Sequence, residues 1–243
     1  MFGAASVAPS DVAGRVVAVI DVLRASTSIA TALANGARAV VPFESSEEVV
    51  TRSKAFARSD VLLAGERRML PIAGFDLGNS PLQFTREAVE GKTLLMTTTN
   101  GTPAVNATSG ARDVVIASYV NYTAVLTMLR AALRGGTDII LICAGRERQF
   151  SLEDAGCAGR YASNVTKRLP DVELSDAAQA CTLIDRRYGD NILKLFKSSD
   201  HGRALSAAGF ENDLAACAAI DAQPVLPIYQ DRQITKLGPE RER

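Results

Sequence analysis

The chain has 243 residues, of which 47% are hydrophobic and 22% are charged, and its 27 Lys and Arg residues balance its 27 Asp and Glu residues. This composition is ordinary for a soluble globular protein and supplies apolar material for one large core or two small ones. A net charge of zero gives no global attraction to nucleic acid or to a membrane surface, so any anion site has to be a local cluster of charge.

Single residue types narrow the possible chemistry further. The one histidine, His201, excludes multi-histidine metal sites and allows a Ser-His-Asp triad only if it is the base. The four cysteines form no CxxC pair, and we expect them to be reduced thiols. No apolar run approaches the roughly 20 residues of a membrane span, and residues 1–10 do not resemble a signal peptide. We therefore expect a cytoplasmic protein whose chemistry rests on carboxylates, arginines, hydroxyls and backbone amides, with no nucleic-acid or membrane partner.

Strand-length apolar runs alternate with helix-length segments from residue 16 onward. Strands are predicted over 16–20, 39–43 and 61–64, with helices over 26–33 and from Ser45. The Asn-Gly pair that follows the first helix is a typical helix end. This β-α-β-α-β order predicts a parallel or mixed sheet with helical crossovers.

The same order then repeats. Strands are predicted over 93–96, 114–117 and 139–143, with helices over 102–108 and 122–133. Gly36-Ala37-Arg38 corresponds to Gly110-Ala111-Arg112, and the Ala-Gly pair at 64–65 corresponds to the one at 144–145. We infer an internal duplication with a period of about 75 to 80 residues. The predicted fold is α/β with two similar β-α-β-α-β halves, the first in residues 1–90 and the second in residues 91–243 together with a helical C-terminal segment.

The C-terminal segment, from residue 151 onward, is predicted to be mainly helical. Helices are predicted over 151–168, with Ser151 as N-cap, and over 175–188, 191–197 and 211–220. Runs at 225–228 and 232–236 are predicted as edge strands, because Pro224 and Pro227 argue against a central position. Residues 238–243 are predicted to be a disordered tail.

Polar residues gather where the predicted strands end, and this is where ligands bind in sheets of this kind. The candidates are Asp21, Arg24, Ser26, Thr27, Glu66, Arg67, Asn79, Thr98, Thr99, Asn100, Gly101, Arg148, Glu153 and Asp154. Hydroxyls and backbone amides can bind phosphate oxygens, arginines can neutralise anions, and carboxylates can hold Mg²⁺. The residue types at the strand ends are therefore those that phosphoryl transfer requires.

Each candidate also has an ordinary structural interpretation. Asp21, Ser26 and Thr27 can be helix caps, and the threonines near 98 can be routine strand-end residues. Glu153 and Asp154 can complement a helix dipole, and Glu66 can pair with a neighbouring arginine. The segment containing His201 can be either a helix start that contacts an anion or a simple cap.

Several known phosphate-binding motifs are absent. A cysteine phosphatase requires Cys-x5-Arg, but Gln149 stands where the arginine after Cys143 would be. A haloacid-dehalogenase-type phosphatase requires Asp-x-Asp, but Leu23 stands at the second position. No Walker A sequence occurs. The missing second aspartate favours attack by water over a phosphoaspartyl intermediate at Asp21.

Seven stretches in this order resemble the 2-phosphosulfolactate phosphatase family. They are VIDVLRASTS at 19–28, LAGER at 63–67, GFDLGNSP at 74–81, TTTNGT at 97–102, CAG at 143–145, FSLED at 150–154 and SDHGR at 199–203. The resemblance extends from about residue 15 to residue 236.

The resemblance implies a Mg²⁺-dependent hydrolase that converts 2-phospho-3-sulfolactate to 3-sulfolactate and phosphate, an α/β fold with two similar halves, and a homodimer. It suggests Asp21, Glu66 and Glu153 as catalytic residues, and Asp21, Glu153 and Asp154 as metal ligands. The suggested substrate-binding residues are Arg24, Ser26, Thr27, Arg67, Asn79, Thr98, Thr99, Asn100, Gly101 and Arg148.

Two departures from the family pattern stand out. The region before Arg15 matches weakly although a further strand is expected there, and Arg68-Met69-Leu70 places bulky residues where a glycine-containing loop is expected. Two other functions remain open: hydrolysis of another small phosphorylated hydroxy acid, or anion binding without catalysis.

Overall fold

The structure is a computed structural model of the chain. It describes residues 7–167, 169 and 171–238. The predicted tail lies outside the described residues, apart from Gly238. Of the region expected to hold an N-terminal strand, residues 7–15 form a short helix and a single bridge between Ala13 and Ala111, and residues 1–6 lie outside the described part.

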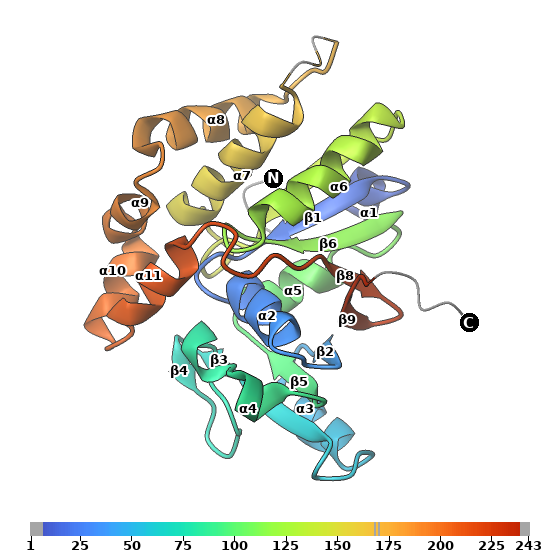
Figure 1. Cartoon of the computed structure of the whole chain (residues 1–243), viewed down its shortest axis with the longest axis vertical. Coiled ribbons are helices and arrows are strands. Elements are labelled where there is room, and N and C mark those ends of the chain that lie inside the picture. Colours follow the sequence, from blue (N-terminus) through green and yellow to red (C-terminus); the bar gives the residue numbers. More distant parts are fainter. Residues whose placement is uncertain (1–6, 168, 170, 239–243) are drawn as a thin grey trace.

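The strands of the described chain form one mixed sheet of nine strands with the order β4-β3-β5-β2-β9-β8-β6-β1-β7 (Figure 1). The strands are β1 (Val16–Ile20), β2 (Ala39–Pro42), β3 (Val61–Arg67), β4 (Leu70–Pro71), β5 (Thr93–Thr97), β6 (Asp113–Ala117), β7 (Ile139–Cys143), β8 (Pro227–Gln230) and β9 (Gln233–Lys236).

Helices connect and cover these strands. They are α1 (Pro9–Val12), α2 (Ala25–Ala34), α3 (Ser46–Ser53), α4 (Arg86–Val89), α5 (Gly101–Asn106), α6 (Tyr122–Arg134), α7 (Leu152–Val165), α8 (Asp176–Tyr188), α9 (Ile192–Ser198), α10 (Asp200–Ala207) and α11 (Glu211–Ala218), with a 3-10 helix, η2, at Pro81–Gln83. Serine side chains cap several helices: Ser45, Ser175 and the predicted cap Ser151 each accept a hydrogen bond from the backbone N–H three residues later.

Two parallel triplets of strands make up most of the sheet. In one triplet β5 lies between β2 and β3, and in the other β1 lies between β6 and β7, all in parallel register. β1 begins the first predicted half, but its partners β6 and β7 belong to the second half. β5 begins the second predicted half, but its partners β2 and β3 belong to the first half. The sheet therefore crosses the predicted boundary at residues 90 and 91. The duplication and the division at that boundary stay predictions.

The prediction that the last two strands lie at a sheet edge is wrong. The chain forms α7 to α11 after β7 and then returns as the β8–β9 hairpin, which joins the triplets by antiparallel pairing with β6 and β2. Pro227 is compatible with this central place because it is the first residue of β8, outside the Val114–Tyr229 and Val115–Ile228 pairs with β6.

The alternating side chains of β1 enter two separate cores. Val16, Ala18 and Ile20 pack with residues of α6, α7 and the later helices, whereas Val17 and Val19 pack with residues of α2 and α5 and of the other triplet. Helices α2 and α5 contact strands of both triplets (Figure 1). They hold the carboxyl ends of β1 and β5 close together, and the candidate site lies there.

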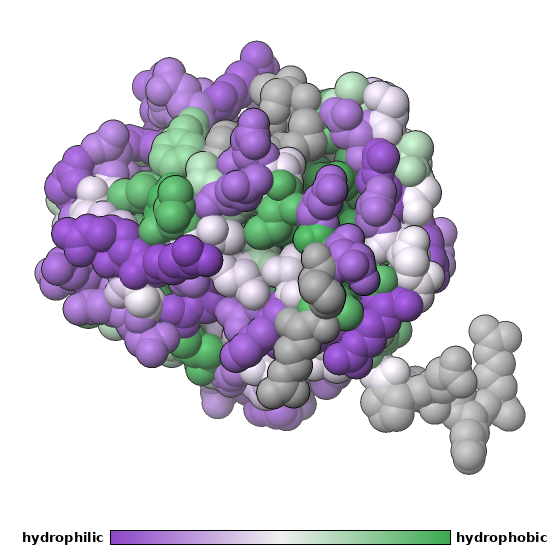
Figure 2. Space-filling model, turned by 90° about the horizontal axis from the view of Figure 1, so that it is seen from above, coloured by the Kyte–Doolittle hydropathy of each residue, from purple (hydrophilic) through white to green (hydrophobic). Residues whose placement is uncertain are grey.

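The molecular surface is mixed in character. The face shown in Figure 2 has hydrophilic side chains interspersed with smaller hydrophobic groups. Among the described residues, no helix combines the length and the apolar character that crossing a membrane requires.

Close packing of α7 against α8 gives a stability prediction. A Cβ atom at Gly159 would lie 2.0 Å from the carbonyl oxygen of Cys181, so Gly159→Ala has to push the two helices apart. We expect this substitution to lower the free energy of unfolding by about 1–3 kcal/mol, as measured by urea denaturation. The control is Gly238→Ala, because a Cβ atom there meets nothing within 4 Å. Equal stability of the two variants would contradict this account of the packing.

Candidate active site

Polar residues that follow four strands line a single cavity of about 200 Å³. Strands β1 and β7 come from one triplet and β3 and β5 from the other, so both triplets contribute. The lining residues are Asp21, Leu23, Arg24, Glu66, Arg68, Met69, Asn79, Thr99, Asn100, Arg146, Glu147 and His201.

Asp21 follows β1 and is an acid of this cavity with a raised pKa. Its side chain is buried, and burial, together with the charges of Glu66 and Glu153, raises its pKa from the ordinary 3.8 to about 6, although His201 and the Ala25 N–H act in the opposite direction. Its Oδ1 accepts a 3.3 Å hydrogen bond from the Ala25 N–H. A Cβ atom at Gly101 would stand 2.8 Å from Oδ2, so the glycine keeps space open beside this oxygen.

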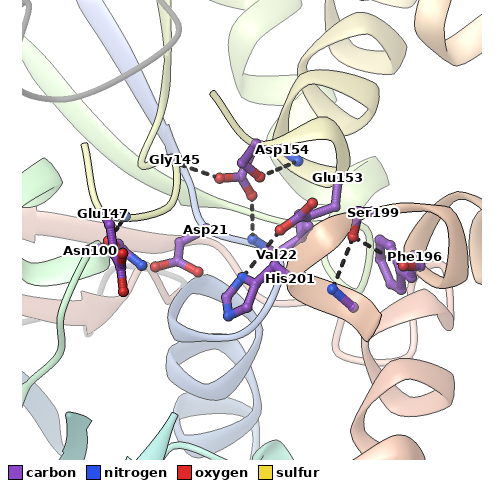
Figure 3. Close-up of polar contacts among 12 residues, drawn as sticks. Asp21, Val22, Asn100, Gly145, Glu147, Glu153, Asp154, Phe196, Ser199 and His201 are labelled. Atoms are coloured by element: carbon purple, nitrogen blue, oxygen red, sulfur yellow. Dashed lines mark hydrogen bonds and ion pairs between the residues drawn. The ribbon is translucent and has the colours of Figure 1, made fainter. Parts of the chain in front are cut away.

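Asp154, at the start of α7, fixes the backbone around Asp21. Its Oδ1 accepts the Val22 N–H at 2.9 Å, and its Oδ2 accepts the Gly145 N–H at 3.1 Å (Figure 3). Burial, reinforced by the charges of Asp21 and Glu153, raises the pKa of Asp154 well above its ordinary value. Asp154 thus ties the loop after β1 to the loop after β7.

Glu153 binds His201, which belongs to α10 and points into the same region (Figure 3). The distance from His201 Nδ1 to Glu153 Oε1 is 3.2 Å. Burial alone would raise the pKa of Glu153, but the hydrogen bond and charge of His201 bring it below its ordinary value. The pair links the C-terminal helices to the cavity.

Glu66, at the end of β3, joins two loops of the other triplet. Its Oε2 accepts the Met69 N–H at 2.7 Å, and its Oε1 accepts the Thr99 N–H at 2.7 Å. The Thr99 hydroxyl donates a further bond to Oε2 at 3.2 Å. Both oxygens of Glu66 therefore hold backbone in place.

Arg24 lines the cavity, but its guanidinium is already bound. It forms a buried 2.7 Å ion pair with Asp213, donates to the Met69 carbonyl at 2.8 Å, and lies 4.3 Å from the centre of the Phe210 ring. Asn79 is different, because its Oδ1 is buried without a hydrogen-bond partner among the described residues, and the residue is only 5% exposed.

Eight predicted site residues do not line the cavity. Two of them are Glu153 and Asp154, whose contacts are described above, and six others remain. Ser26 accepts the Asp21 N–H and thereby positions that residue, and Thr27 bonds to Ser118 and to the Val22 carbonyl. Thr98 and Thr102 bond reciprocally at the start of α5. The other three are Arg67, whose guanidinium donates to Thr97 Oγ1, Gly101 beside Asp21, and Arg148. The substrate-binding roles of these residues stay predictions.

Sequence reasoning missed Arg68 and Arg146 and left the role of His201 open. Arg68 and Met69 form the two-residue turn between β3 and β4, and Arg146 precedes a similar turn made by Glu147 and Arg148. The Ala-Gly correspondence between the halves marked both places, but it did not show which side chains face the cavity.

The described residues contain no group of three or more His, Cys, Asp or Glu side chains arranged to hold a metal ion. Mg²⁺ needs less, because it keeps several waters and takes one or two carboxylates together with substrate oxygens. Asp21 and Asn79 both line the cavity, both carry hard oxygen donors, and Asn79 Oδ1 has no hydrogen-bond partner among the described residues, so this pair of residues suits such an ion. The roles of Glu153 and Asp154 as metal ligands stay predictions.

Comparisons with known proteins agree with one another. The family model described as 2-phosphosulpholactate phosphatase matches residues 4–232. A "Probable 2-phosphosulfolactate phosphatase" of Symbiobacterium thermophilum is 41% identical over 227 residues, which is 93% of this chain and 96% of the relative. Proteins with the same name from Caldanaerobacter subterraneus and Clostridium beijerinckii are 38% and 34% identical, covering 91% and 97% of this chain and 90% and 97% of their own.

The raised pKa of Asp21 predicts a pH-dependent gain in stability for Asp21→Asn. The folded protein binds this proton more tightly than the unfolded chain does, so the charged carboxylate destabilises the fold fully above about pH 6 and not at all below 3.8. In EDTA, the difference in unfolding free energy between variant and wild type should rise by on the order of 3 kcal/mol from pH 4 to pH 7.5. Denaturant titrations at several pH values measure it, and a difference that stays constant with pH would contradict the assignment.

Proposed function

The chain belongs to the 2-phosphosulfolactate phosphatase family, a family of phosphoric monoester hydrolases, and from this premise we propose that it hydrolyses 2-phospho-3-sulfolactate to 3-sulfolactate and phosphate with the help of Mg²⁺. The observation that carries the proposal is the cavity that Asp21 and Asn79, whose Oδ1 has no hydrogen-bond partner among the described residues, line together with arginine side chains. The substrate is a small ester with three acidic groups, in keeping with a cavity of about 200 Å³.

A cation is needed to reconcile this substrate with the acids of the cavity. Asp21, Glu66 and Glu147 all line it and would repel a phosphate ester on their own. Mg²⁺ would neutralise this repulsion and polarise the phosphoryl group for attack. Asp21 and Asn79 are the residues that we propose hold it, and Glu66 keeps the loops after β3 and β5 in place around it.

We propose that water is the nucleophile. Water attacks phosphorus, the bond from phosphorus to the ester oxygen breaks, and that oxygen takes a proton to leave as the alcohol of 3-sulfolactate. The attacking water keeps one proton on the released phosphate and loses the other to solvent, which balances the proton taken by the alcohol. Leu23, two residues after Asp21, cannot supply the second carboxylate that a phosphoaspartyl route uses. His201, oriented by Glu153, lines the cavity and is suited to deliver the proton to the leaving oxygen. In this scheme Glu153 acts through His201.

Three other properties are proposed together with this function. The homodimer and the cytoplasmic location remain predictions, and sedimentation analysis of the purified protein tests the first of them. The duplication is supported by the matching arrangement of the two triplets, each with a middle strand taken from the other half.

Hydrolysis of a related phosphorylated hydroxy acid is the alternative within the same reaction class. An anion-binding protein without catalysis is a weaker account, because a buried acid such as Asp21 opposes anion binding unless a cation accompanies it.

The test is phosphate release from 2-phospho-3-sulfolactate and a panel of small phosphate esters, with Mg²⁺ and with EDTA. We expect release that requires Mg²⁺ and falls by about 1,000-fold or more in Asp21→Asn, since an interaction of several kcal/mol with the reacting group is lost. The control is Asp138→Asn, whose exposed side chain pairs with Arg15. Release from no ester by folded wild-type protein would overturn the proposal, and a different best ester would select the alternative.

A further inference from the structure

Two turns of similar conformation bring arginines to the cavity, one from each triplet. Arg68 and Met69, with φ of 50° and 73°, connect β3 to β4. Glu147 and Arg148, with φ of 49° and 67°, form the turn closed by the bridge between Arg146 and Gln149. Two consecutive left-handed residues are typical of a type I′ turn, which usually contains glycine or asparagine. These turns use larger residues instead, at a conformational cost that other contacts must offset.

The backbone of both turns is fixed by the cavity itself. In the first, Glu66 accepts the Met69 N–H, and Arg24 donates to the Met69 carbonyl. In the second, Asn100 Oδ1 accepts the Glu147 N–H at 2.9 Å. The arginines therefore extend from rigid attachment points, which lowers the entropy lost when they bind a ligand.

The side chains of Arg68 and Arg146 are not committed to other groups. Neither guanidinium forms an ion pair, a side-chain hydrogen bond or a ring contact with another described residue, in contrast to Arg24, which Asp213 neutralises. His201 is similarly held by Glu153. Among the described residues that line the cavity, Arg68 and Arg146 are thus the cations left to meet an anion.

We propose that Arg68 and Arg146 bind the two acidic groups of the substrate that do not react, the sulfonate and the carboxylate, and so determine selectivity for this class of ester. The inference rests on the proposed function and deepens it. Guanidinium groups bind planar carboxylates and multi-oxygen anions through paired N–H donors. Asp21 and Asn79, which we propose hold Mg²⁺ beside the phosphate, are separate from this pair.

The test uses Arg68→Gln and Arg146→Gln with three esters. The first is 2-phospho-3-sulfolactate, the second is 2-phospholactate, which lacks the sulfonate, and the third is glycerol 2-phosphate, which lacks both acidic groups. The control is Arg232→Gln, because Arg232, with φ of 63°, stands in the corresponding type of turn between β8 and β9 and does not line this cavity.

Each cavity variant should lower kcat/KM for 2-phospho-3-sulfolactate by about 10- to 100-fold, the effect of one lost charged hydrogen-bonding group. The loss should be smaller in at least one variant for 2-phospholactate, and small in both for glycerol 2-phosphate. Equal losses for all three esters, no loss for any, or the same loss in Arg232→Gln would each overturn the inference.

Calorimetry with 3-sulfolactate separates this inference from the proposed function. Wild type should bind it, and both cavity variants should bind it more weakly than Arg232→Gln does. If wild type binds 3-sulfolactate in this arginine-dependent way but releases no phosphate, the proposed function fails and the anion site stands. If wild type is an active phosphatase and the variants keep its selectivity and its affinity for 3-sulfolactate, the anion site fails and the function stands.

Discussion

Both carboxylate oxygens of Asp154 accept backbone N–H groups, one from the residue after Asp21 and one from Gly145. Two strand ends of one triplet are joined in this way, and Asp21 is placed where it faces the other triplet. This arrangement places three acids, Asp21, Glu153 and Asp154, close together in a buried region. Burial raises the pKa of both Asp21 and Asp154. The His201 ring beside Glu153 and a bound cation beside Asp21 would both relieve this repulsion.

Local pattern predicted most of the elements. The strand at Val16–Ile20 and the serine cap at Ser151 occur in the structure as expected, because burial and capping are decided by neighbouring residues. The place of the β8–β9 hairpin could not be predicted in this way. Pro227 suggested an edge, but pairing depends on which strands lie on either side, and their order is set by contacts between distant parts of the chain.

The candidate site, like the fold, could be predicted only in part from the sequence. Ligands bind beyond the carboxyl ends of parallel strands, and this rule selected Asp21, Glu66, Thr99 and Asn100, which line one cavity in the structure. It could not separate Arg67 from Arg68, because adjacent side chains point in different directions and the turn after β3 decides which one faces inward. Arg24 shows the converse, since nothing near it in the sequence reveals Asp213 as its partner.

The exchange of middle strands between the triplets has a consequence for how the protein is made. β1 emerges early from the ribosome, yet its neighbours are residues 113–117 and 139–143. Until those residues appear, an entirely apolar strand has no partner in its own triplet, and long-range pairing of this kind is slow and exposed to aggregation. A product of synthesis that ends before residue 201 cannot complete the cavity, because its last contributor, His201, is made only after all three strands of both triplets. The architecture therefore links assembly of the cavity to synthesis of the chain beyond residue 201, and β1 lacks its triplet partners until residues 113–117 and 139–143 have been made.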